Sequence, residues 1–280
     1  MKVLITGSKG QLGRELRKQF RKNDEVSLVL TDIDEMDITD IRDVERVLFL
    51  HKPDVVINCA AHTAVDLCED DKENAFIINV KGAENLAVVS NEIDAVIVHI
   101  STDYVFDGEG DRPYVEEDNT NPQSVYGKTK LDSERVVIQK NPKHFILRTA
   151  WLYGDGRNFV GTMLELAKRM DSLKVVDDQI GNPTSAKQVA IAIIKLIETD
   201  EYGLYHGTCD GECSWYDFAK RIFEINNIDI EVEPCTTDEF PLRAKRPKYS
   251  VLDNKNFRER LGYKFAKWQD AIEEYFQERK

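Results

Sequence analysis

Long hydrophobic runs are absent from this sequence, and their absence argues against a chain that crosses a membrane. No stretch approaches the ~20 consecutive apolar residues that a spanning helix needs. The strand-like run at 2–6 starts almost at the first residue, so we expect no signal peptide either. These two absences predict a cytoplasmic protein with no membrane partner.

The chain also lacks a disulfide framework and a recognisable metal-binding pattern. Its five cysteines are odd in number and scattered, which does not fit a set of paired bridges. His206, Cys209 and Cys213 lie close together in the sequence, but no fourth ligand stands at a zinc-site spacing. We therefore expect reduced thiols and leave the metal unassigned.

An excess of positive charge is missing as well. The 38 lysines and arginines are outnumbered by 51 aspartates and glutamates, which gives a net charge of −13. That balance argues against nucleic acid as the main partner, although a local site can still hold an anionic small molecule. The hydrophobic content of 41% is that of an ordinary globular protein, and 280 residues allow one large domain or two modest ones.

Strand-like and helix-like segments alternate through the first 150 residues. We expect strands at 2–6, 26–30, 54–58, 95–101 and 144–149, and helices at 11–22, 41–50, 72–91 and 125–139. Near-continuous apolar strands that alternate with helices are typical of a parallel sheet covered on both faces. The sequence thus predicts an α/β, doubly wound parallel sheet over residues 1–150.

The alternation loosens after residue 150. Helices are expected at 158–170, 186–198, 215–226 and 268–278, with short strands at 173–176 and 204–209. We interpret residues 151–280 as mainly a smaller α/β substrate-binding lobe, with helix 186–198 returning to the first domain. The loop 103–124 is long for a compact domain, and such loops are usually functional.

Residues 6–13, TGSKGQLG, place Gly7, Gly10 and Gly13 between the first strand and the first helix. Glycine is needed there for a tight turn, for close approach to a pyrophosphate and for close helix–strand packing. Free N–H groups at the helix N-terminus would then bind the phosphates. The register of the three glycines favours a Rossmann-type dinucleotide-binding domain over a turn without a ligand.

Two charged residues give opposite indications of which dinucleotide binds. Asp32 ends the second strand, where an acidic side chain binds the adenosine ribose and would repel a 2′-phosphate, favouring NADH. Lys9, inside the glycine loop, would attract that phosphate and favour NADPH. The choice between NADPH and NADH stays open at this point.

A Tyr-x-x-x-Lys pattern occurs three times, at Tyr126/Lys130, Tyr216/Lys220 and Tyr263/Lys267. Only the first pair begins a helix inside the dinucleotide-binding half, and the other two are expected to pack in the second lobe. Thr102 follows the fourth strand, so its side chain can meet Tyr126 and Lys130 at the carboxyl ends of the strands. These three residues are the candidate catalytic group.

With these motifs the chain resembles the extended short-chain dehydrogenase/reductase family, which is marked by a G-x-x-G-x-x-G loop, a Ser or Thr after the fourth strand, and Tyr-x-x-x-Lys. Within that family it is similar to the dTDP-4-dehydrorhamnose reductases. The likeness rests on stretches spread over nearly the whole chain, among them STDYVFDG (101–108), NPQSVYGKTK (121–130), RTAWLYG (148–154) and DQIGNPT (178–184).

The resemblance implies reduction of the 4-keto group of dTDP-4-dehydrorhamnose to dTDP-L-rhamnose, for cell-surface polysaccharide, with NADPH or NADH as hydride donor. It adds cofactor contacts to the three glycines, namely Gln11, Leu12, Asp32, Asp37, Ile38, Ala60, Ala61, Thr63 and Asn79, together with Tyr126 and Lys130. It assigns the dTDP-sugar to Val65, Thr102, Asp103, Trp151 and, for the diphosphate, Arg246. Asn79 matches a family asparagine that usually supports the backbone.

In this scheme Tyr126 protonates the keto oxygen as hydride arrives. Free tyrosine has a pKa of about 10, and a lysine ammonium one helical turn away is expected to lower it. Lys130 is also expected to hold the nicotinamide ribose, and Thr102 to hydrogen-bond the keto oxygen.

One departure from the family bears on a metal. Some members are dimers bridged by Mg²⁺ through glutamates; Glu15 fits such a position, but Gln188 stands where another glutamate is expected. This argues against Mg²⁺ here and leaves a homodimer as one option.

Two rival functions are another nucleotide-sugar epimerase or dehydratase, and a non-catalytic subunit similar to that of methionine adenosyltransferase. The pair Thr102-Asp103 does not match the Asp-Glu pair typical of the dehydratases.

Overall fold

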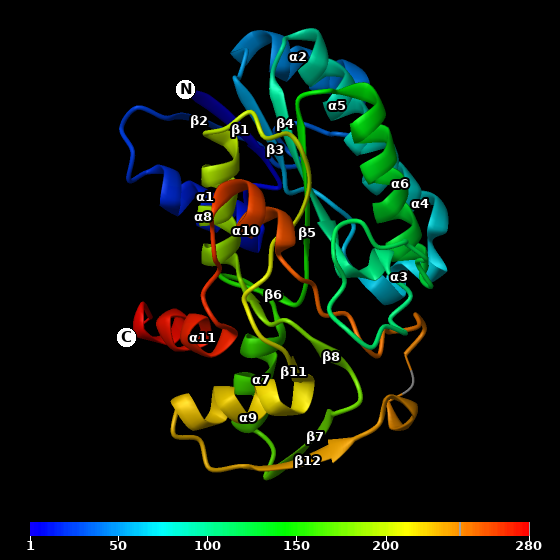
Figure 1. The fold of residues 1–280 in the computed structure, drawn as a ribbon, viewed down its shortest axis with the longest axis vertical. Coiled ribbons are helices and arrows are strands. Elements are labelled where there is room, and N and C mark those ends of the chain that lie inside the picture. Colours follow the sequence, from blue (N-terminus) through cyan, green and yellow to red (C-terminus); the bar gives the residue numbers. More distant parts are fainter. Residues whose placement is uncertain (241, 280) are drawn as a thin grey trace.

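Six parallel strands form the central sheet of the protein. The computed structural model describes residues 1–240 and 242–279. The sheet contains β1 (Lys2–Thr6), β2 (Ser27–Leu30), β3 (Val55–Asn58), β4 (Val96–Thr102), β5 (His144–Thr149) and β10 (Gly203–His206). Their order is β10-β5-β4-β3-β1-β2, and every neighbouring pair is parallel. The predicted doubly wound parallel sheet is confirmed (Figure 1).

Helices cover both faces of this sheet. One face holds α1 (Gln11–Phe20) and α8 (Ala186–Ile197), and the other holds α2 (Ile41–His51), α5 (Gly82–Glu92) and α6 (Val125–Lys140) (Figure 1). In β1, Val3 and Ile5 pack in the core with α1 and α8, and Leu4 packs in the opposite core with α2 and α5. Because side chains alternate between two covered faces, the strands are apolar without interruption.

The helical region predicted at 72–91 contains a π turn. α3 (Val65–Asp70) precedes α4 (Lys72–Phe76), a π-helical turn follows at Ile77–Lys81, and α5 completes the segment. Asp71 caps α4, since its carboxylate accepts a hydrogen bond from the N–H of Asn74 at 3.0 Å. The predicted helical region at 72–91 is confirmed, and the π turn within it is the detail that hydrophobic periodicity does not reveal.

A smaller α/β unit lies below the sheet in Figure 1. It contains β6 (Leu152–Tyr153), α7 (Phe159–Ala167), β7 (Ser172–Val176), β8 (Ile180–Gly181), β9 (Thr184–Ser185), β11 (Cys213–Ser214), α9 (Trp215–Ile225), β12 (Glu231–Cys235) and α11 (Trp268–Gln277). Short helical turns also occur at Asp103–Val105 and Thr237–Glu239. A separate core that includes Val160, Phe218 and Ile272 holds this unit together.

The strand predicted at 204–209 does not belong to the smaller unit. It is β10, which pairs with β5 from Gly203↔Phe145 to His206↔Arg148. A strand that follows a sheet-covering helix commonly joins the same sheet, and α8 is such a helix. α10 (Lys255–Leu261) also returns, because its Phe257 packs in the core shared by α1 and α8. We propose that the first domain consists of residues 1–150 together with α8, β10 and α10.

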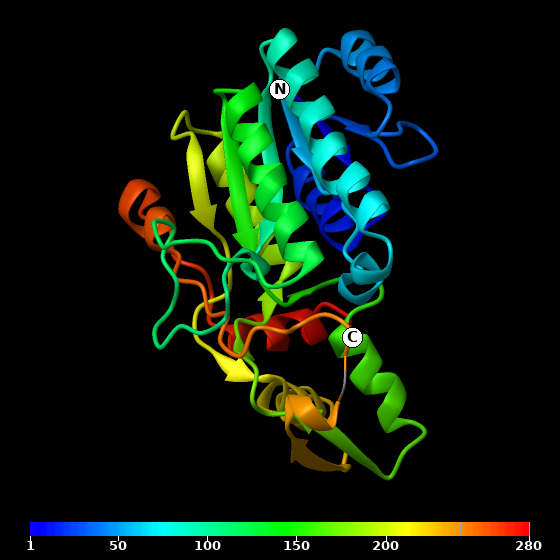
Figure 2. The same cartoon turned by 90° about the vertical axis from the view of Figure 1, so that its right-hand side faces the viewer.

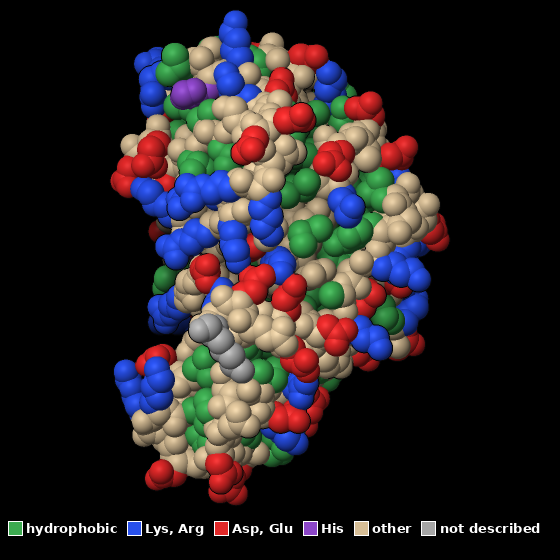
Figure 3. Space-filling model, turned by 90° about the vertical axis from the view of Figure 1, so that its left-hand side faces the viewer, with side chains coloured by type: hydrophobic (Ala, Val, Ile, Leu, Met, Phe, Trp, Pro, Cys, Tyr) green, Lys and Arg blue, Asp and Glu red, His purple; other side chains and the backbone are tan. Residues whose placement is uncertain are grey.

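Charge is unevenly distributed over the surface. Lysine and arginine side chains gather in a band on the face shown in Figure 3, although the whole chain is acidic. α1, which lies on that side of Figure 1, carries the exposed residues Arg14, Arg17 and Lys18. Among the described residues, no helix combines the length and the apolar character needed to cross a membrane.

Candidate active site

A cleft of about 900 Å³ opens at the carboxyl ends of the sheet strands. Ligands of open α/β sheets bind at this edge. Almost all the site residues predicted from the sequence line it: Gly7, Gly10, Gln11, Leu12, Gly13, Asp32, Asp37, Ile38, Ala60, Ala61, Thr63, Val65, Thr102, Asp103, Tyr126, Lys130 and Trp151. Asn79 and Arg246 are the two that do not. The sequence reasoning missed Arg14, Tyr104, Arg157, Gln179, Trp215 and Pro247, which also line the cleft.

The glycine loop has the close contacts that its sequence predicted. Gly7 has φ +59°, and a Cβ there would lie 2.8 Å from the backbone nitrogen of Ala60. A Cβ at Gly13 would lie 2.5 Å from the carbonyl oxygen of Gly7. α1 begins directly after this turn at Gln11, so the unpaired N–H groups of its first turn face the cleft. The loop can therefore bring main chain and helix dipole against a pyrophosphate.

Opposite charges meet at the adenosine end of the cleft. The Asp32 carboxylate accepts hydrogen bonds from the backbone N–H groups of Lys9 at 3.0 Å and Ile33 at 3.0 Å. The Lys9 ammonium is turned to the carboxylates of Asp34, at 2.9 Å, and Glu35, at 3.3 Å. Its charge is thus already paired, and Arg14 is another cation in the cleft lining.

Asn79 holds the loop that follows β3 through hydrogen bonds to His62. Its Oδ1 accepts from the N–H of His62 at 2.7 Å, and its Nδ2 donates to the carbonyl of His62 at 3.2 Å and to Thr129 Oγ1 at 3.0 Å. Thr129 in turn donates to the carbonyl of Tyr126 at 2.9 Å. The π turn that carries Asn79 therefore joins the loop after β3 to the helix of the candidate catalytic group. π turns frequently occur at functional sites.

Tyr126 is buried in the cleft wall, with its ring packed edge-on against Tyr104 at 5.5 Å. Burial raises the pKa of Tyr126 above its ordinary value, and the Thr102 side chain acts in the opposite direction. The Lys130 ammonium is not turned to the tyrosine: it donates to the carbonyl of Ile100 at 2.6 Å and lies 3.3 Å from His99 Nε2. The predicted lowering of the tyrosine pKa by Lys130 was therefore wrong, because burial raises that pKa and the lysine donates to Ile100 instead.

Lys130 is itself almost completely buried. Burial lowers its pKa to about 8, while the nearby Glu134 carboxylate acts to raise it. Glu134 is held in a buried ion pair with Arg148, whose Nε and Nη2 donate to the two carboxylate oxygens at 2.8 and 2.7 Å. Lys130 thus lies between the cleft and the buried Glu134–Arg148 ion pair, in which the two charges neutralise each other.

Thr102 and Asp103 form a pair at the end of β4. The Thr102 hydroxyl donates to Asp103 Oδ1 at 2.9 Å and accepts from the N–H of Tyr104 at 3.3 Å. Burial raises the pKa of Asp103 to about 6, and its Oδ2 has no hydrogen-bond partner among the described residues. The threonine proton is thus directed to the aspartate in this structure, not to the centre of the cleft.

A stacked pair of tryptophans closes the far end of the cleft. The rings of Trp151 and Trp215 are parallel to within 6°, with their centroids 3.5 Å apart. Trp151 has φ +46°, a strained value for a bulky residue, and a Cβ at Gly181 would lie 2.5 Å from its indole. The indole is therefore fixed in place, and both tryptophans belong to the lining of the cleft.

Arg246 lies behind the cleft wall. Its guanidinium donates to Asp66 at 2.6 Å and to the hydroxyl of Tyr104 at 3.1 Å. Tyr104 lines the cleft and its ring contacts Tyr126, so Arg246 is linked to Tyr126 through the side chain of Tyr104. The predicted contact of Arg246 with a diphosphate stays a prediction.

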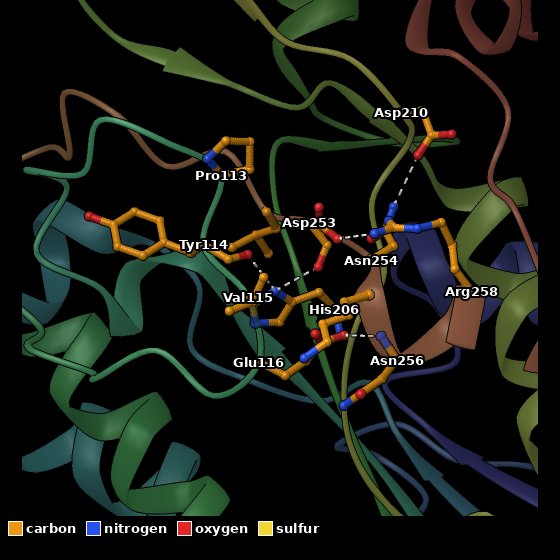
Figure 4. A network of polar contacts seen from close by, with 12 residues as sticks. Pro113, Tyr114, Val115, Glu116, His206, Asp210, Asp253, Asn254, Asn256 and Arg258 are labelled. Carbon is orange, nitrogen blue, oxygen red and sulfur yellow. Dashed lines mark hydrogen bonds and ion pairs between the residues drawn. The ribbon is translucent and has the colours of Figure 1, made fainter. Parts of the chain in front are cut away.

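The long loop 103–124 is anchored to the segment that leads into α10 (Figure 2). Glu116 accepts from the N–H groups of His206 at 3.0 Å and Asn256 at 3.1 Å, and His206 Nδ1 faces the carbonyls of Tyr114 and Asp253 (Figure 4). Burial lowers the pKa of His206 to about 3, so the ring is neutral. The buried network fixes the loop that begins at Asp103, on the wall of the cleft.

The residues considered for metal binding do not form a metal site. Throughout 1–240 and 242–279, no three His, Cys, Asp or Glu side chains gather closely enough to hold an ion. Glu15 Oε1 accepts from Gln19, and Gln188 Oε1 accepts from the N–H of Ala266 at 3.2 Å. The amide oxygen of Gln188 thus already accepts a main-chain hydrogen bond, and the expectation that no Mg²⁺ bridges a dimer stays a prediction.

Comparison with known proteins agrees with this geometry. A family model described as "RmlD substrate binding domain" matches residues 1–280. A solved dTDP-4-dehydrorhamnose reductase from Clostridium acetobutylicum is 52% identical, with a TM-score of 0.98 over 100% of this chain and 99% of that one. The chain belongs to the dTDP-4-dehydrorhamnose reductase family. The resemblance seen in the sequence is thereby confirmed.

Two other similar proteins bear on the cofactor and on the biological role. The dTDP-4-dehydrorhamnose reductase of Bacillus anthracis, solved in complex with NADP, is 41% identical with a TM-score of 0.97, over 99% of both chains. The spore coat polysaccharide biosynthesis protein SpsK of Bacillus subtilis is 43% identical over 99% of this chain and 98% of its own length.

Proposed function

We propose that this chain reduces the 4-keto group of dTDP-4-dehydrorhamnose to a hydroxyl, giving dTDP-L-rhamnose, with NADPH or NADH as reductant. One observation carries the proposal: Thr102, Tyr126 and Lys130 lie in the same cleft as the glycine loop, at the strand ends. Reductases named for this substrate, at 41% and 52% identity, support it. The relation to SpsK supports a role in cell-surface polysaccharide synthesis.

The nicotinamide, when bound, supplies the hydride, and the protein's own groups handle the proton. Because burial holds the pKa of Tyr126 above its ordinary value, the phenol keeps its proton until negative charge develops on the substrate oxygen. Lys130, whose pKa is about 8, is mostly charged at neutral pH and stabilises that developing charge. The stacked Trp151 and Trp215 offer an apolar face for the 6-deoxy sugar or the base.

The decisive measurement is oxidation of NADPH and NADH with dTDP-4-dehydrorhamnose as substrate. We expect turnover by the wild type and a fall in kcat of about 100-fold or more in Tyr126→Phe, because general-acid catalysis is worth that much. Tyr216→Phe is the matched control, since Tyr216 opens another Tyr-x-x-x-Lys pattern in α9, outside the cleft lining. No turnover by the wild type would refute the reductase, and an undiminished Tyr126→Phe would refute the proton donor.

The same assay separates the rival functions. An epimerase or dehydratase would leave net NAD(P)H unchanged while converting a nucleotide sugar, and a regulatory subunit would convert none. The Thr102-Asp103 pair does not supply the Asp-Glu that dehydratases typically use. Product analysis should therefore show one 4-hydroxy sugar formed for each NAD(P)H consumed.

We propose that both dinucleotides are used and that Arg14 contributes to binding of the 2′-phosphate of NADPH. Asp32 favours a free ribose, whereas Arg14 adds a cation to the cleft lining that makes no ion pair within residues 1–240 and 242–279. Arg14→Gln should lower kcat/KM for NADPH about 10-fold, roughly one charge-assisted hydrogen bond, and leave NADH within about 2-fold. Arg21→Gln, beyond the cleft lining at the end of α1, is the control. An equal loss with both cofactors would contradict the assignment.

A further inference from the structure

A histidine lies directly beneath the Lys130 ammonium, in a position that the mechanism above does not use. His99 is on β4 and is 1% exposed. Its ring lies between Asn58, at the end of β3, and Ser133 on α6: Nδ1 is 3.1 Å from Asn58 Nδ2, and Nε2 is 2.8 Å from Ser133 Oγ. Lys130 Nζ lies 3.3 Å from the same Nε2.

The hydrogen-bond partners determine which ring nitrogen of His99 carries the proton. The backbone N–H of Ala60, which can only donate, points to Asn58 Oδ1 at 3.2 Å, and the Thr6 hydroxyl donates to the same oxygen at 2.8 Å. The carbonyl side of the Asn58 amide is therefore fixed, and its NH₂ group faces His99. Because an amide NH₂ only donates, His99 Nδ1 must accept.

The proton of the neutral ring is consequently on Nε2. It points to Ser133 Oγ, whose own hydrogen goes to the carbonyl of Lys130 at 2.6 Å. A second proton, on Nδ1, would set two N–H donors against each other in a buried place. Burial and the nearby Lys130 also hold the pKa of His99 well below its ordinary value. His99 therefore stays neutral in a single tautomer.

This tautomer determines where the lysine can donate. Since Nε2 carries a hydrogen, it offers no lone pair to Lys130, despite the 3.3 Å separation. Within the described chain, the carbonyl of Ile100 at 2.6 Å is the acceptor that Lys130 Nζ reaches. An ammonium has three N–H groups, so two are left for the cleft above it.

We propose that His99 is a positioning residue: as the Nε2–H tautomer it denies Lys130 a second buried acceptor and so reserves two ammonium N–H groups for the cofactor and the reacting oxygen. The inference rests on the proposed reductase function for its catalytic consequence, but not for the tautomer itself. Its partners in holding the tautomer are Asn58 and Ser133.

Two nearly isosteric variants at this position separate the role from simple packing. In His99→Gln the amide can accept from Asn58 and donate to Ser133, which preserves the pattern. In His99→Glu both oxygens accept, so the carboxylate presents a second acceptor to Lys130. We expect His99→Gln to stay within about 3-fold of wild type, and His99→Glu to bind NADPH at least about 10-fold more weakly, the worth of one charged hydrogen bond.

The pH profile gives a second readout that packing alone would not move. The groups that face Lys130 are Glu134 on its own helix, Cys59 after β3 and His99 on β4. A new carboxylate favours the charged lysine, so the alkaline limb of kcat should move to higher pH in His99→Glu and not in His99→Gln. Equal NADPH affinity and equal profiles for the two variants would overturn the proposal.

The tautomer can also be measured directly, without turnover. Nitrogen NMR of histidine-labelled protein, with the His99 signals identified by their absence in His99→Gln, should show Nε2 protonated and Nδ1 bare. Asn58→Asp puts an acceptor against Nδ1, so it should reverse the tautomer and weaken NADPH binding while His99 is intact. A wild-type ring protonated on Nδ1 would refute the inference, whereas failure of the reductase assay would refute only the proposed function.

Discussion

Desolvation controls the ionisable residues around the cleft. It is the largest influence on Tyr126, Lys130 and Asp103, and in each case it moves the pKa towards the neutral form. The sequence suggested that charge pairing between Tyr126 and Lys130 would dominate. In the folded protein both side chains are buried, so the loss of water outweighs the attraction between neighbours. Tyr126 therefore keeps its proton until the substrate develops charge, whereas Lys130 becomes easier to deprotonate.

Asp103 should make stability depend on pH in a defined window. Its folded pKa of about 6 lies above the unfolded value near 3.9, so between about pH 4 and 6 the folded state binds more protons. The free energy of unfolding therefore falls as pH rises through that window. Asp103→Asn does not titrate, so its stability relative to wild type should rise from pH 4 to pH 7, by on the order of 2 kcal/mol. Urea unfolding at both pH values tests this, and a constant difference would contradict it.

At the scale of elements, the first β–α turn shows how sequence and packing act together. A Cβ at Gly13 would collide with the carbonyl of Gly7 and the Cα of Ser8. A Cβ at Gly10 would approach one atom, the Gly7 oxygen, at 3.1 Å. α1 can approach the turn after β1 this closely only without a side chain at its third residue. The close approach is what brings the helix N-terminus to the cleft.

Gly13→Ala should therefore displace α1 and damage the dinucleotide site. A Cβ 2.5 Å from the Gly7 oxygen requires a backbone shift, for which overpacking of about 1–3 kcal/mol is typical. We expect NADPH affinity to fall at least about 10-fold, measured by fluorescence titration. Gly10→Ala is the matched control and should bind NADPH more tightly than Gly13→Ala. The reverse order would show that turn conformation matters more than packing.

At the scale of the whole molecule, the C-terminal helix connects the smaller unit to the sheet. α11 packs in the core of the smaller unit through Ile272 and Phe276. Its far end reaches the helices on the sheet: Glu278 pairs with Lys18 of α1 at 2.8 Å and with Lys187 of α8 at 2.5 Å. These contacts help to hold the two walls of the cleft together.

Glu278→Gln should loosen this connection at neutral pH. Hydrogen bonds from Lys18 and Lys187 lower the pKa of Glu278 to about 2, so its stabilising effect is present above the unfolded value near 4.3 and is lost as pH falls towards 2. Because the pair is partly exposed, the effect should stay below about 1 kcal/mol and shrink in high salt. Thermal melting at pH 7 and pH 3 measures it. Glu165 lies in α7 and its partners Lys168 and Arg169 come just after that helix, so Glu165→Gln should show a smaller change. Equal changes would argue against a bridging role.

Much of the site could be predicted because its motifs are local. Each motif indicates a chemical role within a few residues of sequence. The motifs are the glycine spacing, Thr102 after a strand, and the Tyr126–Lys130 spacing. The parallel order of strands then brings their carboxyl ends to one edge, so residues far apart in sequence meet. What could not be predicted came from distant segments. Trp215 reaches the cleft from α9, and no local pattern marks it as a partner of Trp151.

The sequence by itself determined the alternating α/β order, the glycine-rich turn and the choice of candidate catalytic group, because periodicity and short-range spacing encode them. The tertiary structure alone decided that β10 joins the sheet, that the Lys130 ammonium turns to Ile100, and that His99 lies beneath it as a neutral ring. Hydrogen-bond direction and desolvation depend on neighbours brought together by folding. They set the protonation of the site, and no run of adjacent residues carries that information.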